Sequence, residues 1–199
     1  FMERQPRLSA VNRKTGDDRW SLPLPDSLRR CRNILYLCQS AEKLVAVGSW
    51  LNGRNDSTYE VVCFSASDGR IEWQAQHDKG KPGQTFHGEQ MHHPVIVGDL
   101  LVTEPVIYHL RTGKRIRQDG QPEIWQLDRP GHSCGTISAS RTSIYFRAGN
   151  PTALDLRAHL ARGAEPLKLS PTRPGCWINM IPAGGLLLIP EASSGCVCN

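Results

Sequence analysis

One short pattern occurs three times in this chain of 199 residues: an apolar strand, a Thr-Gly or Asp-Gly pair, and then a tryptophan. The first copy runs from Leu8 to Trp20 and the second from Val61 to Trp73, and in both the Trp follows the Gly by four residues. In the third copy, which begins at Ile107, Trp125 follows Gly113 after a longer insertion. Each copy predicts a strand, a tight turn and a second strand that carries an aromatic residue. Because internal repeats determine architecture, this pattern constrains the fold more than any single motif does.

A second repeat consists of paired apolar strands separated by a turn. It covers His93–Glu104, Cys134–Arg147 and Cys176–Glu191, whose starts lie 41 and 42 residues apart, and Ile34–Val47 is a looser copy. A unit of about 40–45 residues with four short strands is the period of a propeller blade. We therefore expect an all-β fold, a WD40-like β-propeller of four-stranded antiparallel blades. A β-sandwich is the alternative, but it would not repeat a Trp at a fixed phase.

Few segments contradict this all-β prediction. The nearest helix-period run is Leu154–Arg162, which is short and ends at Gly163. The segment from Trp50 to Ser57 is rich in Asn, Asp, Gly and Ser, so it is expected to be a loop.

The repeats also predict the domain organisation. The outer strands of one blade are expected at 7–24, fuller blades at about 31–76, 92–128 and 133–170, and the inner strands of a last blade at 175–199. An open arc of blades leaves unpaired edges. Either the ends join into a small ring or the chain is a partial arc of a larger propeller. We expect the second, with further blades or domains of the same full-length chain as partners.

Composition limits the partners and the compartment. The net charge of +5 comes from scattered basic residues without interleaved aromatics, which does not indicate nucleic-acid binding. No run of 18 apolar residues predicts a transmembrane segment. The seven cysteines indicate a secreted or periplasmic protein with one or two disulfides, and a cytosolic chain with buried thiols is the alternative.

The first repeat resembles the blades of the pyrroloquinoline-quinone-like (quinoprotein dehydrogenase-like) β-propellers. The usual form there is close to Ala-x-Asn/Asp-x-x-Thr-Gly-x-x-x-Trp, and Ala10, Asn12, Thr15, Gly16 and Trp20 match it. The segments around Cys134 and Cys176 also look like an exported, planctomycete-like bacterial subgroup of that family. The resemblance implies that Trp20, Trp73 and Trp125 are structural and pack between blades.

The family contains quinone-dependent dehydrogenases as well as non-enzymatic scaffolds, so the resemblance leaves function open. The dehydrogenases carry a vicinal Cys-Cys pair and a calcium ion held by Glu, Asn and Asp. This chain has no Cys-Cys pair, and nothing in the sequence fixes the spacing of Asp155, Asn179 and Glu191. The motif therefore does not support the family's quinone and calcium site.

One candidate site comes from the repeat alignment. His93, Cys134 and Cys176 each begin an innermost strand, so they are expected to form an arc at one mouth of the central channel, with His92 and His132 beside them. An imidazole and two thiols are ligands for zinc or copper. Two other interpretations remain open: Cys134 and Cys176 form a disulfide, or they are small buried residues.

A second candidate comprises Glu104, Arg147 and Glu191, which end the second inner strands. They are expected either to form structural ion pairs or to bind a polar ligand.

These observations predict an extracytoplasmic binding or scaffold module with a small-molecule or protein ligand at the channel mouth. The alternative is an oxidoreductase that uses a metal or quinone bound at the central channel. No residue is assigned a catalytic role.

Overall fold

A computed structural model describes residues 6–31, 36–40, 42–51, 57–78, 93–117, 127, 129, 135–169, 175 and 179–190. The chain divides into two compact units. The first comprises Phe1–Lys79 and Leu110–Gly113, and the second comprises Gly80–His109 and Lys114–Asn199. Neither of the helices in the described ranges has the length and apolar character required to cross a membrane.

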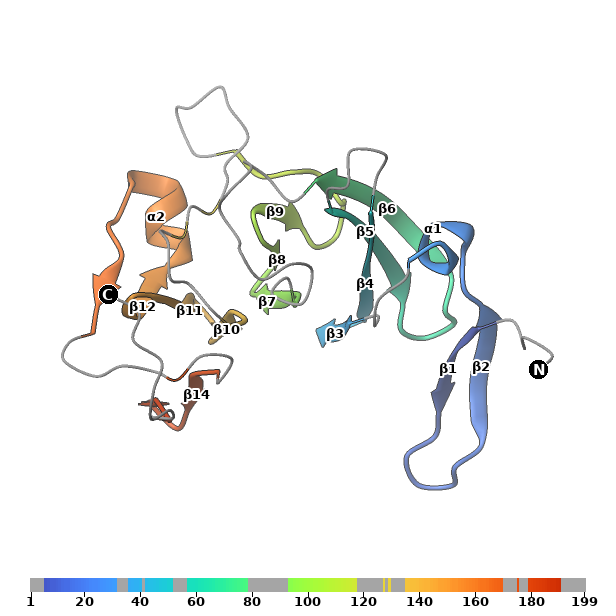
Figure 1. Cartoon of the computed structure of the whole chain (residues 1–199). Helices are drawn as coiled ribbons and strands as arrows, with labels where there is room; N and C mark the ends of the chain where they lie inside the picture. Colours follow the sequence, from blue (N-terminus) through green and yellow to red (C-terminus); the bar gives the residue numbers. More distant parts are fainter. Residues whose placement is uncertain are drawn as a thin grey trace. The chain divides into compact units, whose positions relative to one another are not determined.

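The first unit contains two antiparallel sheets and a short helix (Figure 1). Strands β1 and β2 form a hairpin, and the second sheet has the order β3-β4-β5-β6. The elements are β1 (Arg7–Val11), β2 (Asp18–Pro23), α1 (Asp26–Arg29), β3 (Tyr36–Ser40), β4 (Lys43–Leu51), β5 (Ser57–Ser65) and β6 (Ile71–Asp78). β5 is buried along its whole length because it is a central strand that is covered on both faces.

The core of the first unit lies on one face of the four-stranded sheet. Ala46, Val62 and Phe64 point to this face, where they pack against Leu24 and Leu28 from the segment that contains α1. Side chains alternate between the two faces of a strand, so Val45 and Cys63 lie on the opposite face, and both are fully buried.

The three predicted turns have the same backbone geometry. In each, the residue four before the Gly donates its N–H to the carbonyl of the residue after the Gly, at 2.8 Å; the pairs are Asn12–Asp17, Ser65–Arg70 and His109–Lys114. Gly16, Gly69 and Gly113 have φ values of 79°, 73° and 67°. This left-handed conformation is accessible to Gly at little cost, which explains the invariant position of Gly in the repeat.

Two tryptophans lie against these turns within the first unit. Trp20 Nε1 donates to Ala66 O at 3.1 Å, and Trp73 Nε1 donates to Leu110 O at 2.9 Å. Each acceptor carbonyl lies three residues before the turn Gly, Gly69 or Gly113. The indole ring covers that Gly: a Cβ built there would come within 2.8 Å of Trp20 and 2.6 Å of Trp73. The same contact is thus formed twice, by equivalent residues of successive repeats.

The second unit contains three antiparallel sheets with the orders β7-β8-β9, β10-β11-β12-β13 and β14-β15. The elements are β7 (Val95–Val97), β8 (Leu100–Thr103), β9 (Val106–His109), β10 (Ser138–Ala139), β11 (Ser143–Ala148), β12 (Asn150–Asp155), α2 (Leu156–Arg162), β13 (Leu167–Lys168), β14 (Ile181–Ala183) and β15 (Leu186–Leu188). The Asp155 carboxylate caps α2 by accepting from Ala158 N at 2.9 Å, and Gly163, at φ 68°, ends the helix.

The core of the second unit lies between two of its sheets. Val102 and Ile107 of the β7–β9 sheet pack with Ile144, Phe146 and Leu154 of the β10–β13 sheet. Leu156 at the start of α2 completes this apolar cluster, which explains why the helix stays attached to the sheet.

The prediction of an all-β fold is confirmed, in the form of several separate antiparallel sheets. The structure adds two short helices that the sequence did not predict: α1, and α2, which takes up Leu156–Arg162 of the short helix-period run, whereas Leu154 lies on β12. Trp50 was expected in a loop, but it lies on β4. That strand extends by two residues, Trp50 and Leu51, into the segment that was expected to be a loop.

Two of the turn glycines of the first unit, Gly16 and Gly69, provide a test of the Trp contact. Gly69→Ala and Gly16→Ala both place a Cβ on a left-handed residue, which costs about 1 kcal/mol or slightly more. At Gly16 nothing lies within 4 Å of the new Cβ, whereas at Gly69 the Cβ collides with Trp20 and Leu22. We expect Gly69→Ala to lower the free energy of unfolding by about 1–3 kcal/mol more than Gly16→Ala, measured by urea denaturation. Equal losses in the two variants would contradict the observed packing.

Candidate functional site

The register of the inner strands follows from their turns. The pairs Val97–Leu100, Ser140–Ser143 and Ala183–Leu186 each enclose two turn residues. Val97, Ser140 and Ala183 follow one another at intervals of 43 residues. Four residues before each of them stand His93, Thr136 and Asn179, which are therefore equivalent positions.

This register differs from the one expected from the starts of the apolar runs. Cys134 lies two residues before Thr136, and Cys176 lies three residues before Asn179, so neither cysteine occupies the position of His93. The reason is that the turn sets the register of a hairpin, whereas an apolar run can begin before the paired strand does.

The structure brings two of the equivalent residues together. β10 lies against both β7 and β14, so the inner hairpins of this unit are neighbours. Thr136 Oγ1 forms a hydrogen bond with Asn179 Oδ1. His93, at the same position in the preceding hairpin, is half-buried. This position is therefore polar in all three hairpins, and its donors and acceptors suit hydrogen bonding to a ligand or between sheets.

Most of the predicted metal ligands lie outside the described residues. These are Cys134, Cys176, His92 and His132. The described part of the chain contains no group of three His, Cys, Asp or Glu side chains that could hold a metal ion. The proposed arc of His93 and the two cysteines remains a prediction, as does a disulfide between Cys134 and Cys176.

Glu104 belongs to a buried ion pair with Arg129. Arg129 Nε donates to Glu104 Oε1 at 2.7 Å and Arg129 Nη2 donates to Oε2 at 2.6 Å, so both carboxylate oxygens are engaged. Arg129 Nη1 also donates to Gly135 O at 3.2 Å. Glu104 and Arg129 are only 5% and 4% exposed. This geometry agrees with the structural ion-pair interpretation of Glu104. Arg129 could not be found from the sequence, because it lies in a segment without periodicity.

Of the two other predicted charges, Arg147 stands at the hairpin position equivalent to Glu104, and Glu191 does not. Arg147 stands four residues after Ser143, as Glu104 stands four after Leu100, and it is also buried. Arg147 Nε lies 3.5 Å from Gly149 O. Counting four residues from Leu186 gives Pro190, so Glu191 falls one position later, and it lies outside the described residues.

The cysteines of the first unit carry thiols. Cys31 Sγ donates to Ser27 O at 3.4 Å, and Cys63 Sγ lies 4.0 Å from Leu110 O. Cys38 and Cys63 are free thiols that face the same side of the sheet with Val45 between them. Burial raises the pKa of Cys38 to about 12 and that of Cys63 to about 11. The expected disulfides do not involve these residues, and the other four cysteines lie outside the described ranges.

A polar cluster that the sequence did not predict lies on the α1 side of the first unit's sheet. Glu60 is buried, accepts from Trp50 Nε1 at 2.9 Å, and forms an ion pair with Arg30. The Arg30 guanidinium lies 4.7 Å from the centre of the Trp50 ring and reaches Gln76 at 3.3 Å. These contacts satisfy the buried carboxylate, so the cluster has a sufficient structural explanation.

Trp20 and Trp73 are part-buried and pack on turn glycines, whereas their expected position between propeller blades stays a prediction. Trp125 lies outside the described residues, and Arg117 occupies the position four residues after Gly113. No protein-family model matches the chain, and a search of the curated proteins found no match.

The buried Glu104–Arg129 pair predicts a large effect of removing one charge. Glu104→Gln leaves the Arg129 guanidinium buried without its counterion, so we expect a loss of about 3–5 kcal/mol in the free energy of unfolding. Asp99→Asn is the matched control, because the Asp99 carboxylate pairs with Arg157 at 3.2 Å on the surface and is 53% exposed. That change should cost no more than about 1 kcal/mol. Similar costs in urea denaturation for both variants would argue against a buried pair.

The raised pKa values of Cys38 and Cys63 predict slow alkylation of the folded protein. At pH 7.5 both groups are almost entirely protonated, and the thiolate is the reactive form. Iodoacetamide followed by peptide mass spectrometry should therefore modify both cysteines far more slowly in the native protein than in denaturant. Both folded-state pKa values lie above the ordinary value of 9.0. The free energy of unfolding is therefore unaffected by these thiols below pH 9, and it falls as pH rises toward 11–12, because the unfolded chain loses the protons more readily than the folded one. Rapid native labelling of Cys63 would show that the thiol is accessible.

Proposed function

We propose that the sheets of this chain are blades of a β-propeller arc, and that the arc serves as an extracytoplasmic binding or scaffold module. The observation that carries this proposal is the repeated Trp contact. Trp20 and Trp73 each donate to the carbonyl three residues before a left-handed turn Gly. A modular array of blades requires that each repeat contact the next one in the same way, and this Trp contact is such a repeated contact.

The inner strands add support for a radial arrangement in the second unit. Three hairpins with a constant interval of 43 residues lie side by side through β7, β10 and β14. In a propeller the innermost strands line a central channel, and residues at one hairpin position face one mouth. His93, Thr136 and Asn179 are then the residues that would meet a small-molecule or protein ligand there.

A binding role accounts for the described side chains better than catalysis does. Glu104 is fully engaged by Arg129, and the thiols of Cys38 and Cys63 are held in their protonated form by burial. The sequence also lacks the adjacent cysteine pair of the quinone-dependent dehydrogenases. Among the described residues, Glu104, Cys38 and Cys63 are therefore occupied or protonated groups rather than an activated nucleophile or base.

Metal analysis together with an absorption spectrum of the purified protein tests this proposal. A binding or scaffold module should be colourless and should contain no stoichiometric metal. Stoichiometric zinc or copper, or the colour of a bound quinone, would instead favour the oxidoreductase alternative. In that case His93→Ala and Cys134→Ser should release the metal, whereas Cys31→Ser, whose Sγ bonds to Ser27 O, should retain it.

A further inference from the structure

Equivalent faces of two sheets in the second unit differ in polarity. In the β7–β9 sheet, Val95, Val97, Leu100 and Val102 share one face and pack in the apolar core. Four residues of the β10–β13 sheet stand at the same hairpin positions: Ser138, Ser140, Ser143 and Tyr145. Three hydroxymethyl groups and a phenol thus replace four aliphatic side chains.

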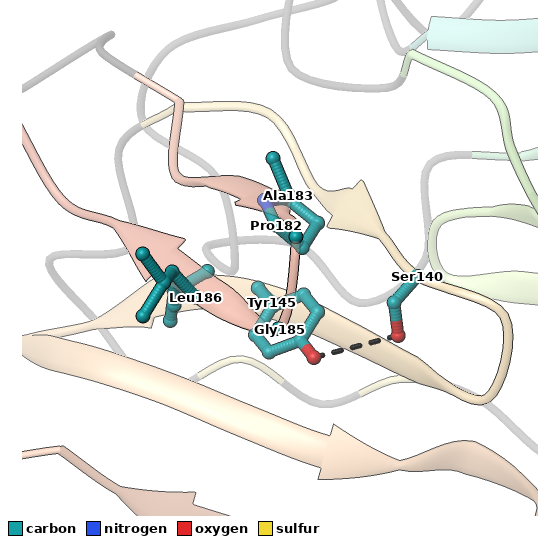
Figure 2. Close-up of a pocket in the computed structure, with 8 residues that line it drawn as sticks. Ser140, Tyr145, Pro182, Ala183, Gly185 and Leu186 are labelled. Carbon is teal, nitrogen blue, oxygen red and sulfur yellow. Dashed lines mark hydrogen bonds between the residues drawn. The ribbon is translucent and has the colours of Figure 1, made fainter.

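This polar face borders a pocket rather than a packed interface. The pocket has a volume of about 280 Å³ and lies between the β10–β11 hairpin and the β14–β15 hairpin. Figure 2 shows the Tyr145 ring beside Gly185 and Leu186, with its hydroxyl directed toward Ser140. The wall opposite Ser140 and Tyr145 is formed by the residues from Pro182 to Leu187.

The Tyr145 hydroxyl at this pocket is weakly engaged. Tyr145 Oη lies 3.4 Å from Ser140 Oγ, which is longer than the usual 2.5–3.0 Å of a hydrogen bond between hydroxyl groups. Ser140 Oγ accepts from Ser143 N at 3.2 Å and lies 3.4 Å from Ser143 O. Ser138, directly across from Tyr145, has a buried Oγ that forms no hydrogen bond with any residue in the described ranges. Ser138 is not among the described residues that line the pocket, so its hydroxyl is not counted among the groups that would meet a ligand.

None of the described residues that line the pocket carries a charged side chain. Its chemistry consists of one aromatic ring, hydroxyl groups that both donate and accept, small apolar side chains, and the backbone of the Gly184–Gly185 turn. This described lining suits a neutral ligand that combines hydroxyl groups with an apolar face that can lie on the ring. Its size is limited, because 280 Å³ is at the lower end of the volumes of ligand pockets.

We propose that the pocket between β10–β11 and β14–β15 binds a neutral sugar ring. The C–H face of the sugar packs on Tyr145, and its hydroxyl groups hydrogen-bond with Ser140 and the Tyr145 hydroxyl. This inference rests on the proposed binding function and adds a second binding site with its own ligand class, at residues other than His93, Thr136 and Asn179 and other than those that carry the Trp contacts.

The test is a titration of uniformly ¹⁵N-labelled protein with the methyl glycosides of glucose, galactose and mannose. For at least one glycoside we expect saturable shifts of the amides of Ser140, Tyr145, Gly184 and Gly185, with a Kd of about 1 mM for a ligand of this size. Tyr145→Phe keeps the ring and removes the hydroxyl, so binding should weaken by about 3–10-fold. Tyr36→Phe, the same change on β3 of the first unit, should leave the affinity unchanged.

Two comparison ligands separate a sugar site from other pockets. Glucuronate adds a carboxylate to the same ring and cyclohexanol removes most of the hydroxyl groups, and both should bind at least 3-fold more weakly than the best glycoside. The proposal is overturned if no glycoside gives saturable shifts at these amides, if cyclohexanol binds equally well, or if Tyr145→Phe has no effect. The Trp contacts and the metal analysis do not depend on these residues, so such a result would leave the proposed binding or scaffold function standing.

Discussion

The contact between an indole and a left-handed glycine turn organises the first unit. Each contact joins three effects: the Gly provides a backbone conformation that other residues adopt at a cost, the missing Cβ leaves room for the ring, and the indole N–H satisfies a turn carbonyl. Any other residue at Gly69 or Gly113 would disturb two of these effects at once. The strands on either side are therefore positioned by the turn and not only by their apolar faces.

The parts of the fold that depend on local chemistry could be predicted from the sequence. Thr15-Gly16 and Asp68-Gly69 fix tight turns, and the Trp four residues later falls on the face that meets another turn. Neither helix was predicted. The periodic run that contains α2 is short, although its end at Gly163 is visible in the sequence. Helix α1 has four residues, which are too few to show a period, and its position depends on the burial of Leu28 in the core.

The candidate site was harder to predict because it depends on register. An alignment that starts at apolar residues selects Cys134 and Cys176, whereas the paired turns select Thr136 and Asn179. A shift of a few residues therefore changes the inferred chemistry from metal binding to hydrogen bonding. The partner of Glu104 is a different case: Arg129 is 25 residues away in the sequence, and only tertiary structure brings the two charges together. The serines and the tyrosine of the polar face of β10 and β11 are visible in the sequence. That they replace apolar core residues became clear only when they were compared with the equivalent positions of β7 and β8.

The segment from Ser65 to Trp73 takes part in two Trp contacts, once as acceptor and once as donor. Its turn at Ala66 and Gly69 accepts a hydrogen bond from Trp20 and packs against that ring, and its own Trp73 donates to and packs on the turn at Leu110–Gly113. A contact in which each copy is acceptor at one end and donor at the other is directional, like the head-to-tail joints of subunits that build rings or filaments. Such a joint sets the order in which copies follow one another but not how many there are. Duplication of a whole copy would therefore keep the existing joints and add one of the same kind, which gives this architecture a simple route to changing its size.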